Sequence, residues 1–162
     1  MNTLFISALN KSSGKTTVSI GLARALANQG RTVQPFKKGP DYIDPMWLGR
    51  AAGRPCVNLD FHTMSHDDIR ATFADTTQGA DFALIEGNKG LFDGLDLQGD
   101  DSMAALAGLL GAPIVLVIDT RGMTRGIAPV VLGYQAFDEK LTIAGVILNQ
   151  VGGPRHEGKL LA

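Results

Sequence analysis

The sequence predicts an α/β fold in which a doubly wound, mainly parallel sheet carries helices on both faces. Five short apolar runs have the length of strands, and they lack the polar alternation of a sheet with one solvated face. Stretches with apolar residues at helical spacing lie between several of these runs. Strands that alternate with helices favour right-handed crossovers, and ligands then bind at the carboxyl ends of the strands. We therefore expect the functional residues directly after the predicted strands.

The elements alternate along the chain. The predicted strands, in order, are 4–6, 32–36, 82–85, 114–118 and 143–148. Helices with a single apolar stripe are predicted over 18–26, 103–110 and 127–134. In the first helix, for example, Val18, Leu22 and Leu26 recur every four residues and would face a sheet. No internal repeat and no low-complexity linker interrupts the series.

The glycine-rich stretches 87–99 and 152–158 follow predicted strands, and we predict that they are loops at the ligand-binding edge. Pro154 cannot continue a strand. The last four residues, 159–162, resemble the opening of a further helix that has no room to complete itself. The sequence therefore suggests a domain that is truncated at its C-terminus.

Composition excludes several classes of protein. The 162 residues fit one domain with a sizeable core, and 15 basic against 16 acidic residues give no field that attracts nucleic acid or anionic lipid. The single cysteine, Cys56, excludes an internal disulfide and a cysteine-based zinc cluster, and it predicts a cytoplasmic protein. Neither a basic N-terminal targeting region nor an apolar run of the ~18 residues that a membrane span needs is present.

A phosphate-binding loop is predicted between the first strand and the first helix. Residues 7–17 read SALNKSSGKTT, where Gly14 lets backbone N–H groups turn toward phosphate oxygens at a helix N-terminus. In such a loop Lys15 reaches the β- and γ-phosphates and Thr16 ligates Mg²⁺. The expected nucleotide-binding set is Asn10, Ser12, Ser13, Gly14, Lys15, Thr16 and Thr17. The fold is accordingly expected to be of the P-loop NTPase type.

The match to a standard P-loop is incomplete. Leu9 stands where the standard pattern has its first glycine. Asn10 stands where some nucleotide-switch proteins carry a signature lysine, and Lys11 comes one residue too late for that role. The alternative interpretation is an ordinary strand-to-helix turn that is capped by a serine or threonine.

Acidic residues follow two of the predicted strands. Glu86 comes directly after the third strand, where a carboxylate is costly unless it meets a cation or solvent. Asp41 and Asp44 lie in the block KKGPDYIDP that follows the second strand. Mg²⁺ on phosphates takes one or two carboxylates, so these acids are candidate ligands, although a solvated turn would also account for Asp41 and Asp44.

Several blocks of the chain resemble one family of ATP-dependent enzymes. They are VQPFKKGPDYIDP at 33–45, GRP at 53–55, NLD at 58–60, EGNKGLFDG at 86–94, DTRGM at 119–123 and GVILNQVGGPRHE at 145–157. In this order, and over essentially the whole chain, the sequence resembles the cobyrinic acid a,c-diamide synthase family. The string GPDYIDP is more specific than the P-loop, since the related dethiobiotin synthetase and cobyric acid synthase lack it in full.

The resemblance implies an ATP-dependent amidoligase that uses Mg²⁺. A side-chain carboxylate of a tetrapyrrole would attack the γ-phosphate of ATP, and ammonia would displace phosphate from the acyl phosphate. The resemblance implies Lys15, Lys37, Asp41 and Asp93 as catalytic residues, Thr16, Asp41 and Glu86 as the Mg²⁺ set, and Asn149 as a contact to the nucleotide base. Asn149 could equally cap a turn. Lys89 adds a cation to the loop expected to face substrate, which leaves the tetrapyrrole open between cobyrinic acid and others such as sirohydrochlorin or sirohaem.

Residues 1–162 are thus expected to form the ATP-binding amidoligase domain, without the glutamine amidotransferase domain of the family. Cys56 has no glycine-rich nucleophile turn around it, so a glutaminase domain or subunit would have to supply ammonia. A homodimer is one possible state. The competing interpretations are a nucleotide switch ATPase of the partition-protein kind and a nucleotide-binding fragment that is inactive without its glutaminase half.

Overall fold

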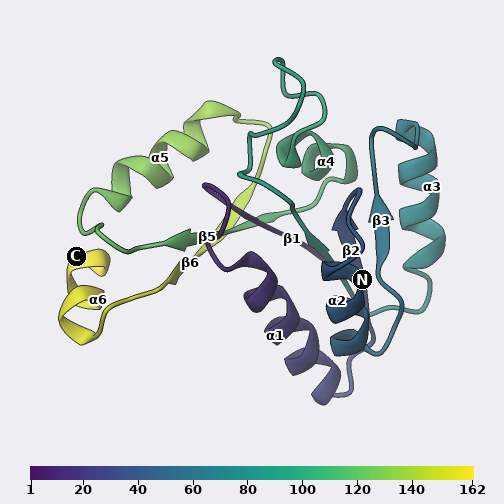
Figure 1. Cartoon of the computed structure of the whole chain (residues 1–162), viewed down its shortest axis with the longest axis horizontal. Coiled ribbons are helices and arrows are strands. Elements are labelled where there is room, and N and C mark those ends of the chain that lie inside the picture. Colours follow the sequence, from purple (N-terminus) through teal and green to yellow (C-terminus); the bar gives the residue numbers. More distant parts are fainter.

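The computed structural model describes all residues 1–162 and contains one parallel sheet of six strands. The strands are β1 (Asn2–Ala8), β2 (Val33–Lys38), β3 (Val57–Leu59), β4 (Phe82–Glu86), β5 (Ile114–Asp119) and β6 (Ile143–Asn149). The helices are α1 (Lys15–Asn28), α2 (Asp44–Ala52), α3 (His66–Thr76), α4 (Met103–Leu110), α5 (Ile127–Phe137) and α6 (Pro154–Leu161). The strand order is β3-β2-β4-β1-β5-β6, and every pair is parallel. The predicted α/β fold is confirmed (Figure 1).

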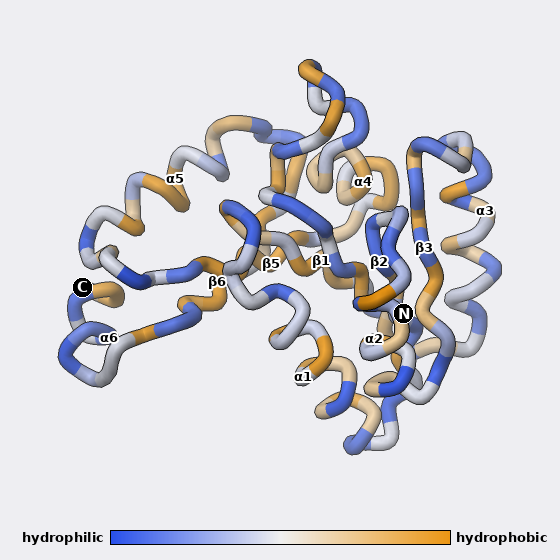
Figure 2. The backbone as a smooth tube through the Cα atoms, in the orientation of Figure 1, coloured by the Kyte–Doolittle hydropathy of each residue, from blue (hydrophilic) through white to orange (hydrophobic).

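Two apolar cores lie on the two faces of the sheet. Neighbouring residues of β1 alternate between them: Phe5 belongs to the larger core, under α3, α4 and α5, and Ile6 to the smaller core, under α1 and α2. Both side chains are fully buried. The helix residues Val18, Leu22 and Leu26 pack against the smaller core, as their spacing predicts. Figure 2 shows hydrophobic residues along the central strands and hydrophilic residues in many of the connections.

All five predicted strands and three predicted helices are present, and the structure adds four elements. β3 has only three residues with a polar one at its centre, which is too short for an apolar pattern to be visible. The helix α2 begins at Asp44 with proline in its first turn, and α3 begins at a capping box between Ser65 and Asp68. Few apolar residues mark α3, so its cap, and not its periodicity, was the usable signal.

The predicted loop at 152–158 is wrong from Pro154 onward. The helix α6 begins there, since the fixed φ of proline suits the first turn of a helix and Gly153 precedes it with a φ of 123°. Leu160 of α6 is buried in the larger core. Residues 159–161 therefore belong to a helix that began at Pro154, and do not open one. None of the helices has both the length and the apolar composition that crossing a membrane requires.

Candidate active site

The backbone of the loop between β1 and α1 has positive φ angles at two positions. Ser12 and Gly14 have φ angles of 62° and 96°, in the left-handed region. A Cβ atom on Gly14 would lie 2.2 Å from Nδ2 of Asn149. Glycine is therefore required here both by the backbone angle and by the close approach of β6.

Hydrogen bonds of two kinds hold this loop: one set lies within the loop, and another comes from β6. The Oγ of Ser13 lies 2.7 Å from Oδ1 of Asn10 and 3.1 Å from the backbone oxygen of Asn10, and donates toward both. The amide Nδ2 of Asn149, at the end of β6, donates to the backbone oxygen of Ser13 at 2.9 Å. The amide nitrogen of Asn149 is thus engaged with the loop, and its contact to a nucleotide base stays a prediction.

Glu86 occupies the centre of the site at the end of β4. In the sheet register it stands opposite Lys37 of β2 on one side and Ile6 of β1 on the other, which makes it fully buried. Its Oε1 accepts hydrogen bonds from Oγ1 of Thr16 at 2.6 Å and from Nζ of Lys37 at 3.0 Å. Its buried Oε2 has no partner. Burial raises the pKa of Glu86, although Lys37 and Thr16 oppose that change.

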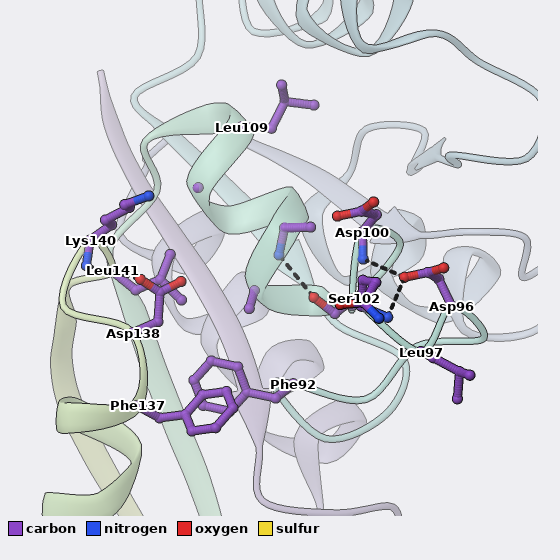
Figure 3. A pocket seen from close by; sticks show the side chains of 15 residues that line it. Phe92, Asp96, Leu97, Asp100, Ser102, Leu109, Phe137, Asp138, Lys140 and Leu141 are labelled. Carbon is purple, nitrogen blue, oxygen red and sulfur yellow. Dashed lines mark hydrogen bonds between the residues drawn. The ribbon is translucent and has the colours of Figure 1, made fainter.

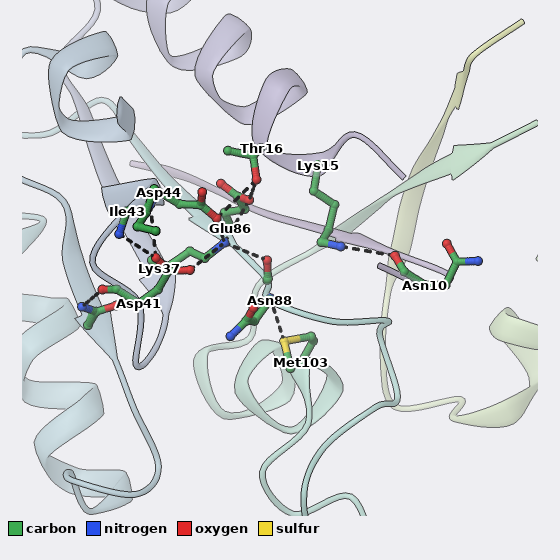
Figure 4. Close-up of polar contacts among 12 residues, drawn as sticks. Asn10, Lys15, Thr16, Lys37, Asp41, Ile43, Asp44, Glu86, Asn88 and Met103 are labelled. Carbon is green, nitrogen blue, oxygen red and sulfur yellow. Dashed lines mark hydrogen bonds and ion pairs between the residues drawn. The ribbon is translucent and has the colours of Figure 1, made fainter. Parts of the chain in front are cut away.

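Lys37 links the acids of the site. It is 2% exposed, and its Nζ lies 2.7 Å from Oδ2 of Asp44 and donates to the backbone oxygen of Gly87 at 3.3 Å. Burial alone would lower the pKa of Lys37, but the charges and hydrogen bonds of Glu86 and Asp44 outweigh burial and raise it. Figure 4 shows Lys37 between these carboxylates. The ammonium is therefore held charged and fixed in position.

The two acids of the GPDYIDP block have different places. Oδ2 of Asp44 accepts from Lys37 and, at 3.3 Å, from Oγ1 of Thr16, and Asp44 lines the cavity. Oδ1 of Asp41 instead accepts from the backbone N–H groups of Ile43 and Asp44, at 2.9 and 3.1 Å, and so orders the turn into α2. Asp41 lies 3.9 Å from Lys37 and outside the cavity wall. The resemblance implies Asp41 as a Mg²⁺ ligand, which stays a prediction, but of these two acids it is Asp44 that contacts Thr16 and lines the cavity.

These residues enclose a polar cavity of about 220 Å³ at the start of α1. Its lining residues, none of them hydrophobic, are Ser12, Gly14, Lys15, Thr16, Thr17, Lys37, Asp44, Glu86 and Asn88. Asn10 and Asn149 support the loop from outside this wall. Asp93, from the loop after β4, is exposed and does not line the cavity, although its negative charge acts on Lys15.

Lys15 is buried without a carboxylate partner. It is 6% exposed, and its Nζ donates to the backbone oxygen of Asn10 at 3.3 Å. Burial lowers the pKa of Lys15, and the more distant charge of Glu86 only partly offsets this. A buried ammonium that lacks an anion gains strongly from one that enters its cavity.

The donors around Thr16 suit a magnesium ion. No group of three or more histidine, cysteine or carboxylate side chains converges as a metal site. Mg²⁺ at a triphosphate needs no such group, because it takes a hydroxyl, one or two carboxylates, phosphate oxygens and waters. Thr16, Asp44 and Glu86 supply that set, and the unpartnered buried Oε2 of Glu86 is a free ligand atom.

Other chemically capable residues lie away from this cavity. The thiol of Cys56 is in the wall of a shallow pocket beside α2, and burial raises its pKa to about 12. Such a thiol is not a nucleophile at neutral pH. The guanidinium of Arg121 forms hydrogen bonds with both carboxylate oxygens of Asp119, so its charge is already paired.

The largest cavity is a different one. It measures about 610 Å³ and lies between α4, the loop 96–100 and the end of α5 (Figure 3). Phe92 and Phe137 meet there with ring centroids 4.6 Å apart. It shares no residue with the polar cavity at the start of α1, which we call the phosphate cavity. Lys140 is its only lysine or arginine. Its size alone does not make it the reactive site.

Replacing Asn149 by aspartate is expected to disturb the phosphate loop. A carboxylate of the same shape cannot donate to the backbone oxygen of Ser13, and it would face that oxygen with a negative charge. Loss of one buried hydrogen bond costs about 1 kcal/mol, and the repulsion adds to it. We expect the free energy of unfolding in urea to fall, and nucleotide affinity to fall at least several-fold.

The control is Asn149→Ala, which removes the hydrogen bond without adding a charge. It should lie between the parent and Asn149→Asp in both measurements. Equal affinity of all three proteins for Mg-ATP in calorimetric titrations would contradict a supporting role for this side chain.

Comparison with known proteins places these residues in context. The AAA domain family matches residues 2–162. A cobyrinate a,c-diamide synthase of Magnetococcus marinus is 55% identical over 157 residues, which cover 97% of this chain and 34% of that protein. A hydrogenobyrinate a,c-diamide synthase of Mycobacterium tuberculosis is 46% identical over 157 residues, with shares of 94% and 34%. The chain thus spans about one third of the length of these relatives.

Solved structures share the fold at low sequence identity. The signal recognition particle 54 kDa protein of Aeropyrum pernix, in complex with GDP, has a TM-score of 0.64 at 20% identity, over 94% of this chain and 36% of that one. The kinase domain of the Escherichia coli tyrosine kinase ETK has a TM-score of 0.64 at 18% identity, over 94% and 69%. Both support the P-loop type of α/β fold.

Proposed function

Because the chain belongs to the AAA domain family and has cobyrinate and hydrogenobyrinate a,c-diamide synthases as relatives, we propose that it is the ATP-binding part of a tetrapyrrole amidoligase. The enzyme converts side-chain carboxylates of its substrate into amides at the expense of ATP. The chain covers about one third of those relatives, so the complete reaction is proposed for a larger assembly.

One observation carries this proposal: a polar cavity holds two buried lysines with different surroundings. Lys15 has no carboxylate partner, as a triphosphate site requires. Lys37, across the cavity, is held between Asp44 and Glu86, which keep its amine charged and fixed in position. Lys15 therefore binds the β- and γ-phosphates, and Lys37 faces the γ-phosphoryl group and the substrate carboxylate that attacks it.

The remaining residues of the site hold the metal ion and orient the reacting groups. Thr16, Asp44 and Glu86 hold Mg²⁺, which when bound withdraws charge from the phosphate oxygens. Asp41 fixes the turn that carries Asp44, through its hydrogen bonds to the backbone. Asp93 positions substrate or ammonia from the loop after β4. Catalysis by this set consists of positioning and charge stabilisation.

The reaction proceeds in two steps, phosphoryl transfer and then amide formation. A carboxylate oxygen of the substrate forms a bond to the γ-phosphorus as the bond from that phosphorus to the β–γ bridging oxygen breaks, which releases ADP. The nitrogen of ammonia then attacks the acyl carbon, inorganic phosphate leaves with the electron pair of the carbon–oxygen bond, and the nitrogen loses one proton. Ammonia comes from glutamine through a glutaminase domain or subunit, since Cys56 is unsuited to that chemistry.

Measurement of ADP release with cobyrinic acid and ammonia tests this function. We expect multiple-turnover release of ADP that depends on both compounds, with the amide product identified by mass spectrometry. Glutamine should replace ammonia only when a glutaminase partner is present. ADP release that a protein or DNA partner stimulates without any tetrapyrrole would contradict the proposal and favour a nucleotide switch.

A further inference from the structure

A second pocket, which we call the Lys38 pocket, lies next to the phosphate cavity. It has a volume of about 200 Å³, and its polar and charged lining residues are Lys38, His62, Asn88, Lys89 and Asp101. Asn88 lines both cavities, so they are direct neighbours. In Figure 4 Asn88 lies below the group of Lys37, Asp44 and Glu86. A ligand that spans Asn88 would contact the residues of both cavities.

Lys38 is buried in this pocket without an anionic partner. It is the last residue of β2, and alternation along the strand turns it to the face opposite Lys37. The side chain is 5% exposed, yet its Nζ takes part in no hydrogen bond and no ion pair. The Nζ atom lies over the ring of Phe61, 5.8 Å from the ring centroid. The Nζ atom itself is not fully enclosed, and a largely desolvated ammonium that opens to a pocket gains from an anion that enters it.

The one carboxylate of the pocket is already engaged. The oxygens of Asp101 accept hydrogen bonds from the backbone N–H groups of Leu95 and Asp96, at 2.9 to 3.1 Å. The Nε2 atom of His62 lies 3.8 Å from Oδ2 of Asp101. Burial lowers the pKa of Lys38, and the charges of Asp101 and Asp60 only partly oppose that change. The carboxylate of Asp101 holds its own loop, and the ammonium of Lys38 has no direct ion-pair partner.

We propose that the Lys38 pocket binds a second, non-reacting carboxylate of the substrate, with Lys38 at its base and Lys89 at its rim. The inference rests on the proposed function, because a substrate with several carboxylates is what can reach both cavities. The reacting carboxylate lies beside the γ-phosphate while a neighbouring one is anchored beyond Asn88. This anchoring selects polycarboxylates and fixes which of their carboxylates reacts.

Binding of cobyrinic acid by single variants tests the inference. Its affinity is measured by calorimetry in the presence of Mg²⁺ and a non-hydrolysable ATP analogue, for the parent, Lys38→Met and Lys89→Ala. In Lys38→Met, methionine keeps the length of the buried side chain. Lys89 is only half-buried, so Lys89→Ala should fold normally. We expect each variant to bind cobyrinic acid about ten-fold more weakly, as for loss of one charge-assisted hydrogen bond. Affinity for the ATP analogue should stay within about two-fold of the parent.

A matched control and three outcomes make the result decisive. Lys159→Met removes an exposed lysine of α6 outside both cavities and should bind cobyrinic acid like the parent. Unchanged binding of cobyrinic acid by both pocket variants would overturn this inference and leave the proposed function standing. A parallel loss of nucleotide affinity would also overturn it, because the pocket would then serve ATP. Failure of the parent itself to bind cobyrinic acid would overturn the proposed function together with this inference.

Discussion

Lys15→Met is expected to weaken Mg-ATP binding about 100-fold and to leave the fold at least as stable as in the parent protein. The Nζ atom of Lys15 makes a single hydrogen bond, to the backbone oxygen of Asn10, and no ion pair. That oxygen also accepts from Oγ of Ser13, so it keeps a partner in the variant. The change therefore removes a ligand contact without leaving a buried charge unpaired.

The sign of the stability effect follows from the pKa of Lys15. Burial lowers this pKa, so the folded state disfavours the charged amine relative to the unfolded chain. At pH values below the folded pKa the charge therefore reduces the free energy of unfolding, and methionine removes that reduction. We expect equal or higher stability in urea at about pH 7.

The expected loss in nucleotide affinity is about 100-fold, since Lys15 makes charged contacts to two phosphates. Calorimetric titration with Mg-ATP measures it. Lys11→Met is the matched control, because Lys11 is an exposed lysine of the same loop that does not line the cavity. Lys11→Met should lower the affinity for Mg-ATP much less than Lys15→Met does. Tight binding of Mg-ATP by Lys15→Met would contradict the phosphate site.

Local patterns were sufficient for most of the fold and for the phosphate loop. The strands β1, β2, β4 and β5 are covered on both faces, and such burial leaves continuous apolar runs in the sequence. The edge strand β6 is only half-buried, but its apolar side chains also pack against both cores. The loop ahead of α1 could be located because its glycine, lysine and threonine stand between a strand and a helix. The three-residue β3 and the sparsely apolar α3 leave no such pattern.

The arrangement of the site depended on contacts that the sequence does not display. Lys37 and Glu86 are register partners only because β4 pairs directly with β2, 49 residues earlier. The contact of Asn149 with the phosphate loop spans 136 residues. The choice between Asp41 and Asp44 depends on where α2 begins, since Asp44 is its first residue and Asp41 lies in the turn before it. The sequence pattern predicts that these residues lie at one edge of the sheet, but it does not predict which of them contact one another.

Lys37→Met is expected to destabilise the fold strongly, in contrast to Lys15→Met. The ammonium of Lys37 compensates Glu86, which is fully buried, and Asp44, which is partly exposed. Removing one partner of a buried ion pair leaves an uncompensated charge and costs about 3 kcal/mol or more. The free energy of unfolding in urea, measured without Mg²⁺, should fall by about that amount near neutral pH.

The loss should depend on pH through Glu86. Its pKa in the folded protein is raised above the ordinary 4.5, so the folded state binds this proton more tightly than the unfolded chain does. The free energy of unfolding therefore falls as the pH rises from 4.5 through the folded pKa. Lys37 holds that pKa down in the parent, so its removal raises the folded pKa further and makes the fall larger. The raised pKa of Lys37 itself adds no slope in this range, because its contribution is lost only at alkaline pH.

The double variant Lys37→Met with Glu86→Gln separates charge from packing. Glutamine keeps the shape of Glu86 and cannot become an anion, so the penalty for an unpaired charge should largely disappear and the pH dependence with it. The single and double variants are compared with Glu86→Gln alone at about pH 5 and about pH 7. Equal destabilisation by Lys37→Met at both pH values, with no recovery in the double variant, would mean that Lys37 stabilises the site by packing. Its charge would then be irrelevant to the fold, and its assigned role at the γ-phosphoryl group would lose its electrostatic basis.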